Sequence, residues 1–195
     1  MKAPGPKHIV LGVTGSIAAY KAADLIRAWT AKGVRVSVIM THQAEQFITP
    51  LTLASLSGGR VYRDLFDVTD DGEKMPHIFL AREADAIVIA PATAHVIGKM
   101  ASGLADDLLT NVILATEAPV VVAPAMNPVM YHNAIVQENC RKLKSMGFHW
   151  IEPCEGKLAC GEYGVGHFAE TETIVQAVEK ILKVTTSQRH KVTKK

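Results

Sequence analysis

The feature that most limits the fold of this chain is a short, β-branched apolar run at residues 119–123 (PVVVA). Such a run is typical of a strand buried on both faces, which places it in the middle of an α/β sheet. It is followed by Pro124-Ala-Met-Asn-Pro128, where the two prolines are expected to exclude a helix and keep the backbone extended. Asn127 would then lie at the carboxyl end of a central strand, the edge where open α/β sheets bind ligands.

Asn127 has two interpretations at this stage. Its side-chain amide both donates and accepts hydrogen bonds, which suits a substrate carboxylate or amide. Alternatively, the segment is only a turn bracketed by prolines, in which the asparagine satisfies its own backbone.

Strand and helix patterns alternate along the rest of the chain. The expected strands are residues 7–13, 34–40, 86–90, 119–123 and 148–151. The expected helices are residues 17–32, 41–47, 50–56, 77–85, 96–101, 106–115, 134–146 and 171–182. Residues 58–74 are polar and rich in glycine and aspartate, which predicts a mobile surface loop. The alternation predicts an α/β fold built on a doubly wound parallel sheet.

Composition narrows the class of protein. With 195 residues, of which 48% are hydrophobic and 21% charged, the chain has the size and balance of one globular domain, expected at residues 1–184. Residues 185–195 are basic and lack apolar periodicity, so a disordered tail is expected there. A net charge of +2 is too small to indicate a nucleic-acid surface, and no apolar run approaches the roughly 20 residues that cross a bilayer. Three unevenly spaced cysteines do not predict a disulfide framework, so a cytoplasmic location is expected.

The first βα connection, Gly12-Val-Thr-Gly15-Ser16, is a candidate phosphate site. It follows a strand and opens a helix that Ser16 is placed to cap, so its backbone N–H groups suit an anion. The spacing fits neither the dinucleotide fingerprint nor a Walker loop, which disfavours nicotinamide dinucleotides and ATP and leaves a mononucleotide. The alternative is a tight connection with no ligand.

Two further residues are of the types that carry proton chemistry. His77 follows Pro76 at an expected helix start, where it is either a proton-transfer group or a surface histidine. Cys160 lies in a segment with three glycines, which indicates either a flexible lid or a close backbone approach to a ligand. Its neighbour Cys154 makes a metal or redox pair conceivable, but no C-x-x-C motif and no metal-ligand spacing of the histidines is present.

Taken together and in this order, the motifs resemble those of the flavin-dependent cysteine decarboxylases, and within them the group that acts on 4′-phosphopantothenoylcysteine. The similarity covers residues 7–182. The motifs are GVTGSIAAYKA (12–22), PHI (76–78), PATA (91–94), GLADDLLTN (103–111), PAMNPVM (124–130) and LACGEYGVG (158–166). Each motif is modest alone, and six in register are specific.

The resemblance implies a flavodoxin-like or Rossmann-like sheet with helices on both faces, and FMN as cofactor. The implied FMN-binding residues are Gly15, Ser16, Ile17, Thr41, Pro91, Ala92, Thr93 and Ala94. The implied catalytic residues are His77, Asn127 and Cys160, and the implied substrate-binding residues are Ala125, Met126, Asn127 and Met130. In the implied reaction the thiol carbon of the substrate is oxidised, carbon dioxide leaves, and the product is reduced again with a proton from Cys160.

The resemblance also implies partners. Members of this family assemble from trimers, as homotrimers or homododecamers, with active sites shared between subunits, and in bacteria they are often fused to, or work with, a phosphopantothenate–cysteine ligase. Nothing after residue 182 resembles that ligase, which suggests a stand-alone form or a trimmed chain. This chain departs from the usual family pattern at His95, Tyr131 and His167, where asparagine, tryptophan and arginine are common.

Four alternative functions remain. A decarboxylase of a peptide's C-terminal cysteine shares most of these motifs, whereas a flavin prenyltransferase lacks the pair formed by PAMNPVM and LACG. A regulatory partner of phosphatases would be expected to lose a catalytic residue, and His77, Asn127 and Cys160 are all present. A generic nucleotide-binding domain would carry no flavin.

Overall fold

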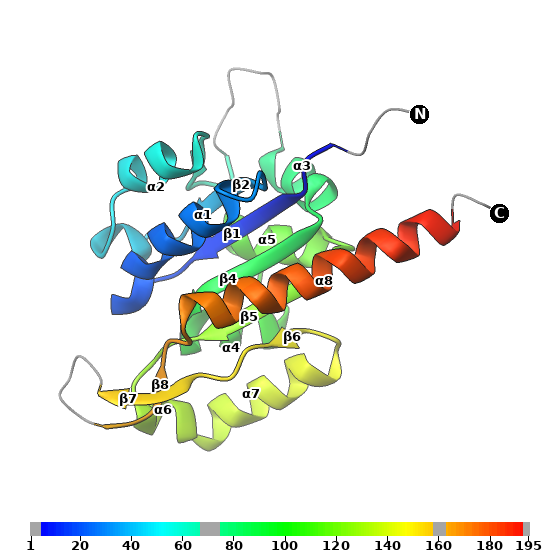
Figure 1. The fold of residues 1–195 in the computed structure, drawn as a ribbon. Helices are drawn as coiled ribbons and strands as arrows, with labels where there is room; N and C mark the ends of the chain where they lie inside the picture. The colour runs from blue at the N-terminus through cyan, green and yellow to red at the C-terminus, as the bar shows by residue number, and fades with distance from the viewer. Residues whose placement is uncertain (1–4, 67–74, 158–162, 193–195) are drawn as a thin grey trace.

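The fold is a six-stranded parallel sheet with helices on both faces (Figure 1). The computed structural model describes residues 5–66, 75–157 and 163–192, with residues 184–192 as backbone only. The strands are β1 (His8–Val13), β2 (Arg35–Met40), β3 (Val61–Tyr62), β4 (Ala86–Ala92), β5 (Val120–Pro124), β6 (His149–Trp150), β7 (Cys154–Lys157) and β8 (Tyr163–His167). The helices are η1 (Ile17–Lys21), α1 (Ala22–Thr30), η2 (Ala44–Gln46), α2 (Pro50–Ser57), α3 (Pro76–Glu83), α4 (Ala94–Ser102), α5 (Leu108–Ala115), α6 (Pro128–His132), α7 (Ala134–Ser145) and α8 (Thr171–Val192), where η marks a 3-10 helix.

The order of strands in the sheet, β3-β2-β1-β4-β5-β6, confirms the doubly wound α/β fold. All neighbouring pairs are parallel. The chain begins in the middle with β1, adds β2 and β3 on one side, and then crosses to β4, β5 and β6 on the other. Because the order reverses between β1 and β4, the loops that follow these two strands diverge and leave room for a ligand. Strands β7 and β8 form a separate antiparallel hairpin.

The three central strands β1, β4 and β5 are buried along their whole length. Burial on both faces is the reason that they appear in the sequence as unbroken apolar runs. Alternate residues of β1 face opposite layers: Ile9 and Leu11 belong to the cluster formed with α1, α2 and α8, and Val10 to the cluster formed with α3, α4, α5 and α7. The sheet is therefore packed between two apolar layers, and this packing fixes the positions of the strand ends at its carboxyl edge.

The segment after β5 differs from the prediction. Helix α6 begins at Pro128, directly after Asn127, so the prediction that the two prolines exclude a helix here was wrong. Proline is accepted in the first turn of a helix because the N–H group that it lacks would have no partner there. Asn127 itself keeps extended backbone angles (φ −58°, ψ 145°) and caps the helix.

Two other boundaries also differ. The segment 58–74 was expected to be a loop, but it contains β3, which pairs with β2 over two residues; residues 67–74 lie outside the described part of the chain. Helix α8 continues to Val192 instead of ending at residue 182, and so enters the segment that was expected to be disordered. No glycine or proline follows residue 182 to end the helix, and Gln188, Arg189 and Lys191 are good helix formers.

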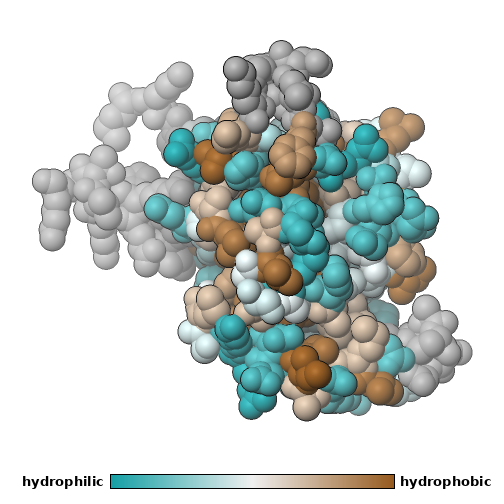
Figure 2. All heavy atoms as spheres, turned by 180° about the vertical axis from the view of Figure 1, so that it is seen from behind, coloured by the Kyte–Doolittle hydropathy of each residue, from teal (hydrophilic) through white to brown (hydrophobic). Residues whose placement is uncertain are grey.

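The surface gives few indications of function by itself. In the described part of the chain, no helix has both the length and the apolar character that crossing a membrane requires. On the face shown in Figure 2, hydrophobic side chains are scattered among hydrophilic ones. Scattered apolar residues are normal on a folded surface. The feature that calls for a functional explanation is the cavity at the carboxyl edge of the sheet.

Candidate functional site

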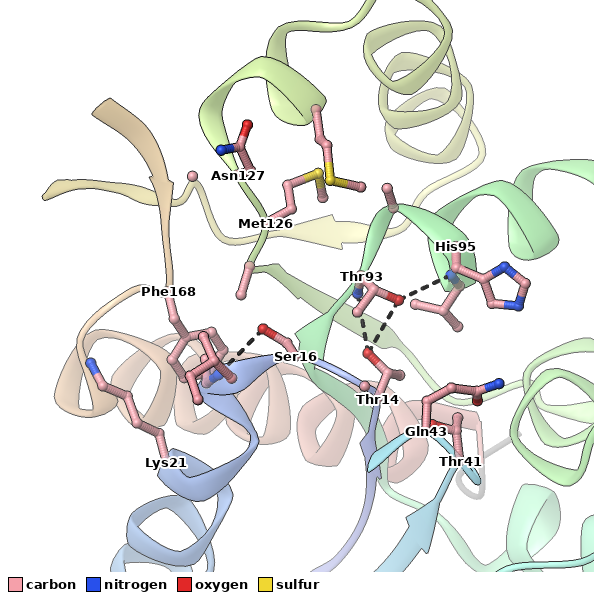
Figure 3. Close-up of a pocket in the computed structure, with 18 of the residues that line it drawn as sticks. Thr14, Ser16, Lys21, Thr41, Gln43, Thr93, His95, Met126, Asn127 and Phe168 are labelled. Atoms are coloured by element: carbon pink, nitrogen blue, oxygen red, sulfur yellow. Dashed lines mark hydrogen bonds between the residues drawn. The ribbon is translucent and has the colours of Figure 1, made fainter. Parts of the chain in front are cut away.

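A cavity of about 730 Å³ lies where the strand order reverses (Figure 3). Its walls come from the segments that follow β1, β2, β4 and β5, together with the end of β8. Parallel strands end at the same edge of a sheet, which explains how segments so distant in sequence meet here. The volume lies in the range of cavities that hold a small organic cofactor or substrate.

The loop after β1 contributes closely packed backbone. A Cβ on Gly15 would lie 2.4 Å from the Cβ of Gln43, so only glycine allows this loop to pack on the segment after β2. The Oγ of Ser16 accepts a hydrogen bond from the N–H of Ala18 at 3.3 Å, which confirms the predicted cap. Gly15 and Ser16 both line the cavity, and a hydroxyl on a tight glycine turn suits a phosphate group.

Thr41, one residue beyond β2, indicates that the cavity has a polar occupant. Its Oγ1 is buried and has no hydrogen-bond partner among the described residues, although the residue lines the cavity. A buried polar atom without a partner costs about 1–3 kcal/mol. A ligand that supplies the missing hydrogen bond would account for this hydroxyl.

The turn after β4 is tied to the end of β1 by side-chain hydrogen bonds. The Ala90–Pro91 peptide bond is cis. The hydroxyl of Thr14 donates to the carbonyl oxygen of Pro91 at 2.6 Å and accepts from the N–H of Thr93 at 3.1 Å. Thr93 in turn caps α4, because its Oγ1 accepts from the N–H of Val96 at 3.3 Å. The first turn of α4 therefore faces the cavity in a defined position (Figure 3).

A paired charge forms another part of the wall. The Nζ of Lys99 lies 2.6 Å from Oδ1 of Asp106 and 2.7 Å from Oδ2 of Asp107, and only 12% of the lysine side chain is exposed. Burial opposes the charge on Lys99, but the hydrogen bonds that its ammonium group donates to the two carboxylates outweigh this effect and raise the pKa of the lysine. Asp107 also caps α5, through a bond of 2.8 Å from the N–H of Thr110 to its Oδ1. This cluster joins α4 to α5 beside the cavity.

Asn127 lines the cavity and also caps α6. Its Oδ1 accepts a hydrogen bond from the N–H of Val129 at 2.8 Å, so the asparagine satisfies a nearby backbone group as the turn interpretation predicted, while its place in the cavity lining leaves ligand binding as a prediction. The backbone before it is fixed by β8, because the N–H of Met126 donates to the carbonyl oxygen of Gly166 at 3.0 Å. Asn127 thus lies between a capped helix and the β7–β8 hairpin.

Tyr131, within α6, ties this helix to the elements that follow it. Its hydroxyl donates to Oε2 of Glu152 at 2.9 Å, and its carbonyl oxygen accepts from the side-chain amide of Gln137 at 2.6 Å. Burial, assisted by Glu152, raises the pKa of Tyr131 to about 12. The tyrosine is therefore a neutral hydrogen-bond donor at physiological pH.

The structure brings most of the predicted site residues to one cavity. The lining includes Gly15, Ser16, Ile17, Thr41, Thr93, Ala94, Ala125, Met126, Asn127 and Met130. Pro91 and Ala92 are buried and are not part of the lining. Cys160 lies outside the described residues.

His77 is not brought to the cavity of its own chain. It lies in the first turn of α3, which Figure 1 shows well away from α6 and the β7–β8 hairpin. Among the residues that the structure describes, it is not one of those that line the cavity. Its Nδ1 is buried without a hydrogen-bond partner in that part of the chain.

Several lining residues were not predicted from the sequence: Thr14, Lys21, Gln43, Lys99, Asp107 and Phe168. Three of these residues lie inside the motifs at 12–22 and 103–111: Thr14, Lys21 and Asp107. Their place in loops expected at the carboxyl edge of the sheet could have identified them as lining residues. Lys99 and Gln43 stand in no such motif. His95 and His167, identified as departures from the family pattern, both line the cavity.

Comparisons with known proteins agree with this geometry. The chain matches the flavoprotein family over residues 2–183. It is 47% identical over 178 residues to a protein from Streptococcus mutans named probable phosphopantothenoylcysteine decarboxylase, covering 90% of this chain and 99% of that protein. It is 46% identical over 179 residues to the coenzyme A biosynthesis bifunctional protein CoaBC of Vibrio cholerae, covering 92% of this chain and 45% of that protein. The chain thus spans less than half the length of this bifunctional relative.

Solved structures give the same result. A cysteine-to-serine mutant of PPC decarboxylase complexed with pantothenoylaminoethenethiol superposes with a TM-score of 0.84 at 33% identity, covering 91% of this chain and 99% of that one. The FMN binding protein AtHal3 superposes with a TM-score of 0.78 at 34% identity, covering 91% and 97%. The chain therefore belongs to the flavoprotein family, in the branch of the phosphopantothenoylcysteine decarboxylase homologues.

Proposed function

We propose that this protein is an FMN-dependent carboxy-lyase that converts 4′-phosphopantothenoylcysteine to 4′-phosphopantetheine in coenzyme A biosynthesis. The observation that carries the proposal is that Gly15, Thr41 and Asn127, which lie far apart in the sequence, line one cavity in a chain of this family. The names of its full-length and bifunctional relatives support the choice of reaction. A cytoplasmic location remains a prediction from the sequence.

The residues present fit FMN. The hydroxyl of Thr41 is buried beside the cavity and lacks a partner, the Gly15-Ser16 turn suits the phosphate, and Ile17, Ala94 and Met126 provide apolar walls for a flat ring. The residues that would hold it are Gly15, Ser16, Ile17, Thr41, Thr93 and Ala94, with Pro91 and Ala92 supporting the turn from behind. When bound, FMN supplies the two-electron chemistry that makes loss of carbon dioxide feasible.

Asn127 is proposed to bind the substrate carboxylate. A neutral amide orients the carboxylate without the strong pairing that a cation would provide, and strong pairing would stabilise the starting state more than the transition state. The cap on Val129 and the bond between Met126 and Gly166 hold Asn127 in place before substrate arrives. Met130 and Ala125 line the cavity on either side of it.

His77 and Cys160 are proposed to handle protons. His77 would stabilise the substrate thiolate, and Cys160 would return a proton in the last step. Since His77 does not line the cavity of its own chain, we propose that a second subunit supplies it and that the protein works as a homo-oligomer built from trimers.

The test is to mix the purified chain with 4′-phosphopantothenoylcysteine and identify the product by mass spectrometry. The expected product has lost one carbon dioxide and shows no net oxidation. The variant Cys160→Ser is expected to release a product that has lost carbon dioxide and has two hydrogen atoms fewer than 4′-phosphopantetheine, because without the thiol proton the final addition of a hydride and a proton would not take place. Normal product from Cys160→Ser would remove this cysteine from the mechanism.

A peptide with a C-terminal cysteine serves as the competing substrate. The second candidate function, peptide cysteine decarboxylation, rests on the motifs that this chain shares with such enzymes. The chain also superposes on the FMN-dependent cysteine decarboxylase SpaF, with a TM-score of 0.74 at 32% identity. A flavin-containing chain that turns over the peptide and leaves 4′-phosphopantothenoylcysteine unchanged would contradict the proposed substrate.

A further inference from the structure

The backbone ladder between β1 and β4 stops before the cavity begins. The paired residues run from Ile9 with Ala86 to Gly12 with Ile89. On its other edge, β4 pairs with β5, and the register of this pairing shifts between Ile89 and Ala92. A shift of this kind re-aims the chain and is common next to active sites. Beyond Gly12, β1 and β4 are therefore connected through hydrogen bonds of a side chain.

That side chain is Thr14, whose hydroxyl is used in both directions. It donates to the carbonyl oxygen of Pro91 at 2.6 Å and accepts from the N–H of Thr93 at 3.1 Å. Thr14 is only 2% exposed, and both hydrogen bonds join residues 77 or more positions apart. Both hydrogen-bonding functions of the hydroxyl are thus used within the protein. Thr14 can therefore affect a ligand only by positioning the turn at residues 91–93.

The turn it holds leads directly into α4. The N–H of Thr93 donates to the hydroxyl of Thr14, while the Oγ1 of Thr93 caps the helix by accepting from the N–H of Val96. The four residues from 93 to 96 all line the cavity. A shift of the 91–93 turn would move all four at once, together with the helix that carries Lys99.

We propose that Thr14 is the positioning residue of the cofactor cavity: its buried hydroxyl holds the 91–93 turn and the first turn of α4 in the arrangement that binds FMN. This inference rests on the proposed function and assigns a role to a residue that does not itself touch the flavin. A hydroxyl meets the requirement, because one small group must donate to a carbonyl and accept from an N–H, and a thiol does both only weakly.

Substitution of Thr14 separates this role from simple packing. Thr14→Val keeps the shape of the side chain but leaves the carbonyl of Pro91 and the N–H of Thr93 buried without partners. Thr14→Ser keeps the hydroxyl and loses only a methyl group. We expect Thr14→Val to bind FMN at least about tenfold more weakly than the wild type, and Thr14→Ser to bind within about threefold of it.

Thr116 provides the matched control. Its hydroxyl donates to the carbonyl oxygen of Ala81 at 3.0 Å and accepts from the N–H of Ala118 at 3.0 Å, the same pattern as in Thr14. It lies at the end of α5 and is not part of the cavity lining among the described residues. Thr116→Val is therefore expected to lower the free energy of unfolding while FMN affinity stays at the wild-type level.

The measurement is the dissociation constant of FMN, from flavin fluorescence on dilution of each holoprotein, with the urea midpoint recorded with and without added FMN. Wild-type affinity in Thr14→Val would overturn the inference, and so would equal weakening in Thr14→Ser or Thr116→Val. If the valine variant is not recovered folded, Thr14→Cys, which keeps a weak donor and acceptor, is compared with Thr14→Ser by the same criterion. A wild-type chain that binds no FMN would instead overturn the proposed function.

Discussion

Gly166 has a backbone conformation that side chains rarely adopt, and it touches the segment that carries Asn127. Its φ is +140°, and a Cβ at this position would lie 2.4 Å from the carbonyl oxygen of Met126. Its own carbonyl accepts the N–H of Met126, so the two segments cannot separate without losing a buried hydrogen bond. A single glycine thus sets the distance between the β7–β8 hairpin and the segment that carries Asn127.

We expect Gly166→Ala to lower the free energy of unfolding by about 1–3 kcal/mol and to reduce turnover, because the hairpin must move away from Met126. Urea denaturation and kcat measure the two effects. The control is Gly33→Ala, because Gly33 has a φ of +74° but nothing within 4 Å of an added Cβ. Equal effects of both variants on turnover would show that the contact with Met126 has no special role.

At the scale of elements, the amino ends of β1 and β2 and the end of α3 meet around one buried histidine. His8 is 2% exposed; its Nε2 lies 2.8 Å from Oγ of Ser37, and its Nδ1 lies 3.1 Å from the carbonyl oxygen of Glu83. Arg35 also approaches Nδ1, at 3.0 Å. Burial, followed by the charge of Arg35, lowers the pKa of His8 below its usual 6.5, against the opposing effect of Glu83 and Asp85.

This cluster predicts a loss of stability in mild acid. Since the pKa of His8 is lower in the folded chain than in the unfolded chain, the unfolded chain binds more protons as the pH falls through 6.5, and stability decreases there by at most about 1.4 kcal/mol per pH unit. Well above pH 6.5 the histidine is neutral in both states and contributes no slope.

The measurement is urea unfolding between about pH 7.5 and about pH 5.5, where carboxylates contribute little. His8→Gln is expected to flatten the dependence of stability on pH relative to the wild type. His132→Gln, which replaces an exposed histidine, is the matched control and is expected to keep the wild-type slope. A slope that is unchanged in His8→Gln would contradict the assignment.

At the scale of the whole molecule, one chain presents an incomplete set of proposed catalytic groups. Asn127 lines the cavity, whereas His77 lies on α3 and is not part of the lining that the structure describes. A symmetric assembly would solve this by bringing His77 of one copy to the cavity of the next. Experiments that mix two inactive variants can therefore test whether His77 of one copy completes the cavity of another.

We expect His77→Gln and Asn127→Asp to be inactive separately and to recover activity when the two are co-expressed. In a random mixture, about one quarter of the shared sites would contain an intact His77 and an intact Asn127 from different chains. Activity and mass in solution are measured on the same sample. A fully active monomer, or no recovery in mixed assemblies that are shown to form, would contradict shared sites.

The sequence by itself was sufficient to predict those strands and helix caps that depend on neighbouring residues alone. Strands β1, β4 and β5 were predicted because burial on both faces demands unbroken apolar residues, and the cap at Ser16 because a short hydroxyl side chain before a helix satisfies its first N–H groups. Most of the candidate site also followed from the motifs, because motif residues cluster at loops after strands. The two-residue strand β3 was missed because it is too short to show a period, and the helix that starts at Pro128 was missed because the two prolines were expected to exclude a helix.

Tertiary structure alone decided which of these local pieces act together. The bond from Thr14 to Pro91 spans 77 positions, and that from Met126 to Gly166 joins two separate elements, so no periodicity or motif spacing could reveal either. Likewise, His77 and Asn127 belong to motifs of one family, yet the fold separates them within a chain. The sequence by itself determined which segments form the parallel sheet, which of its strands are buried on both faces, and which types of side chain stand at the site. Their distances depend on how the loops pack at the carboxyl edge, and that packing is a property of the folded chain as a whole.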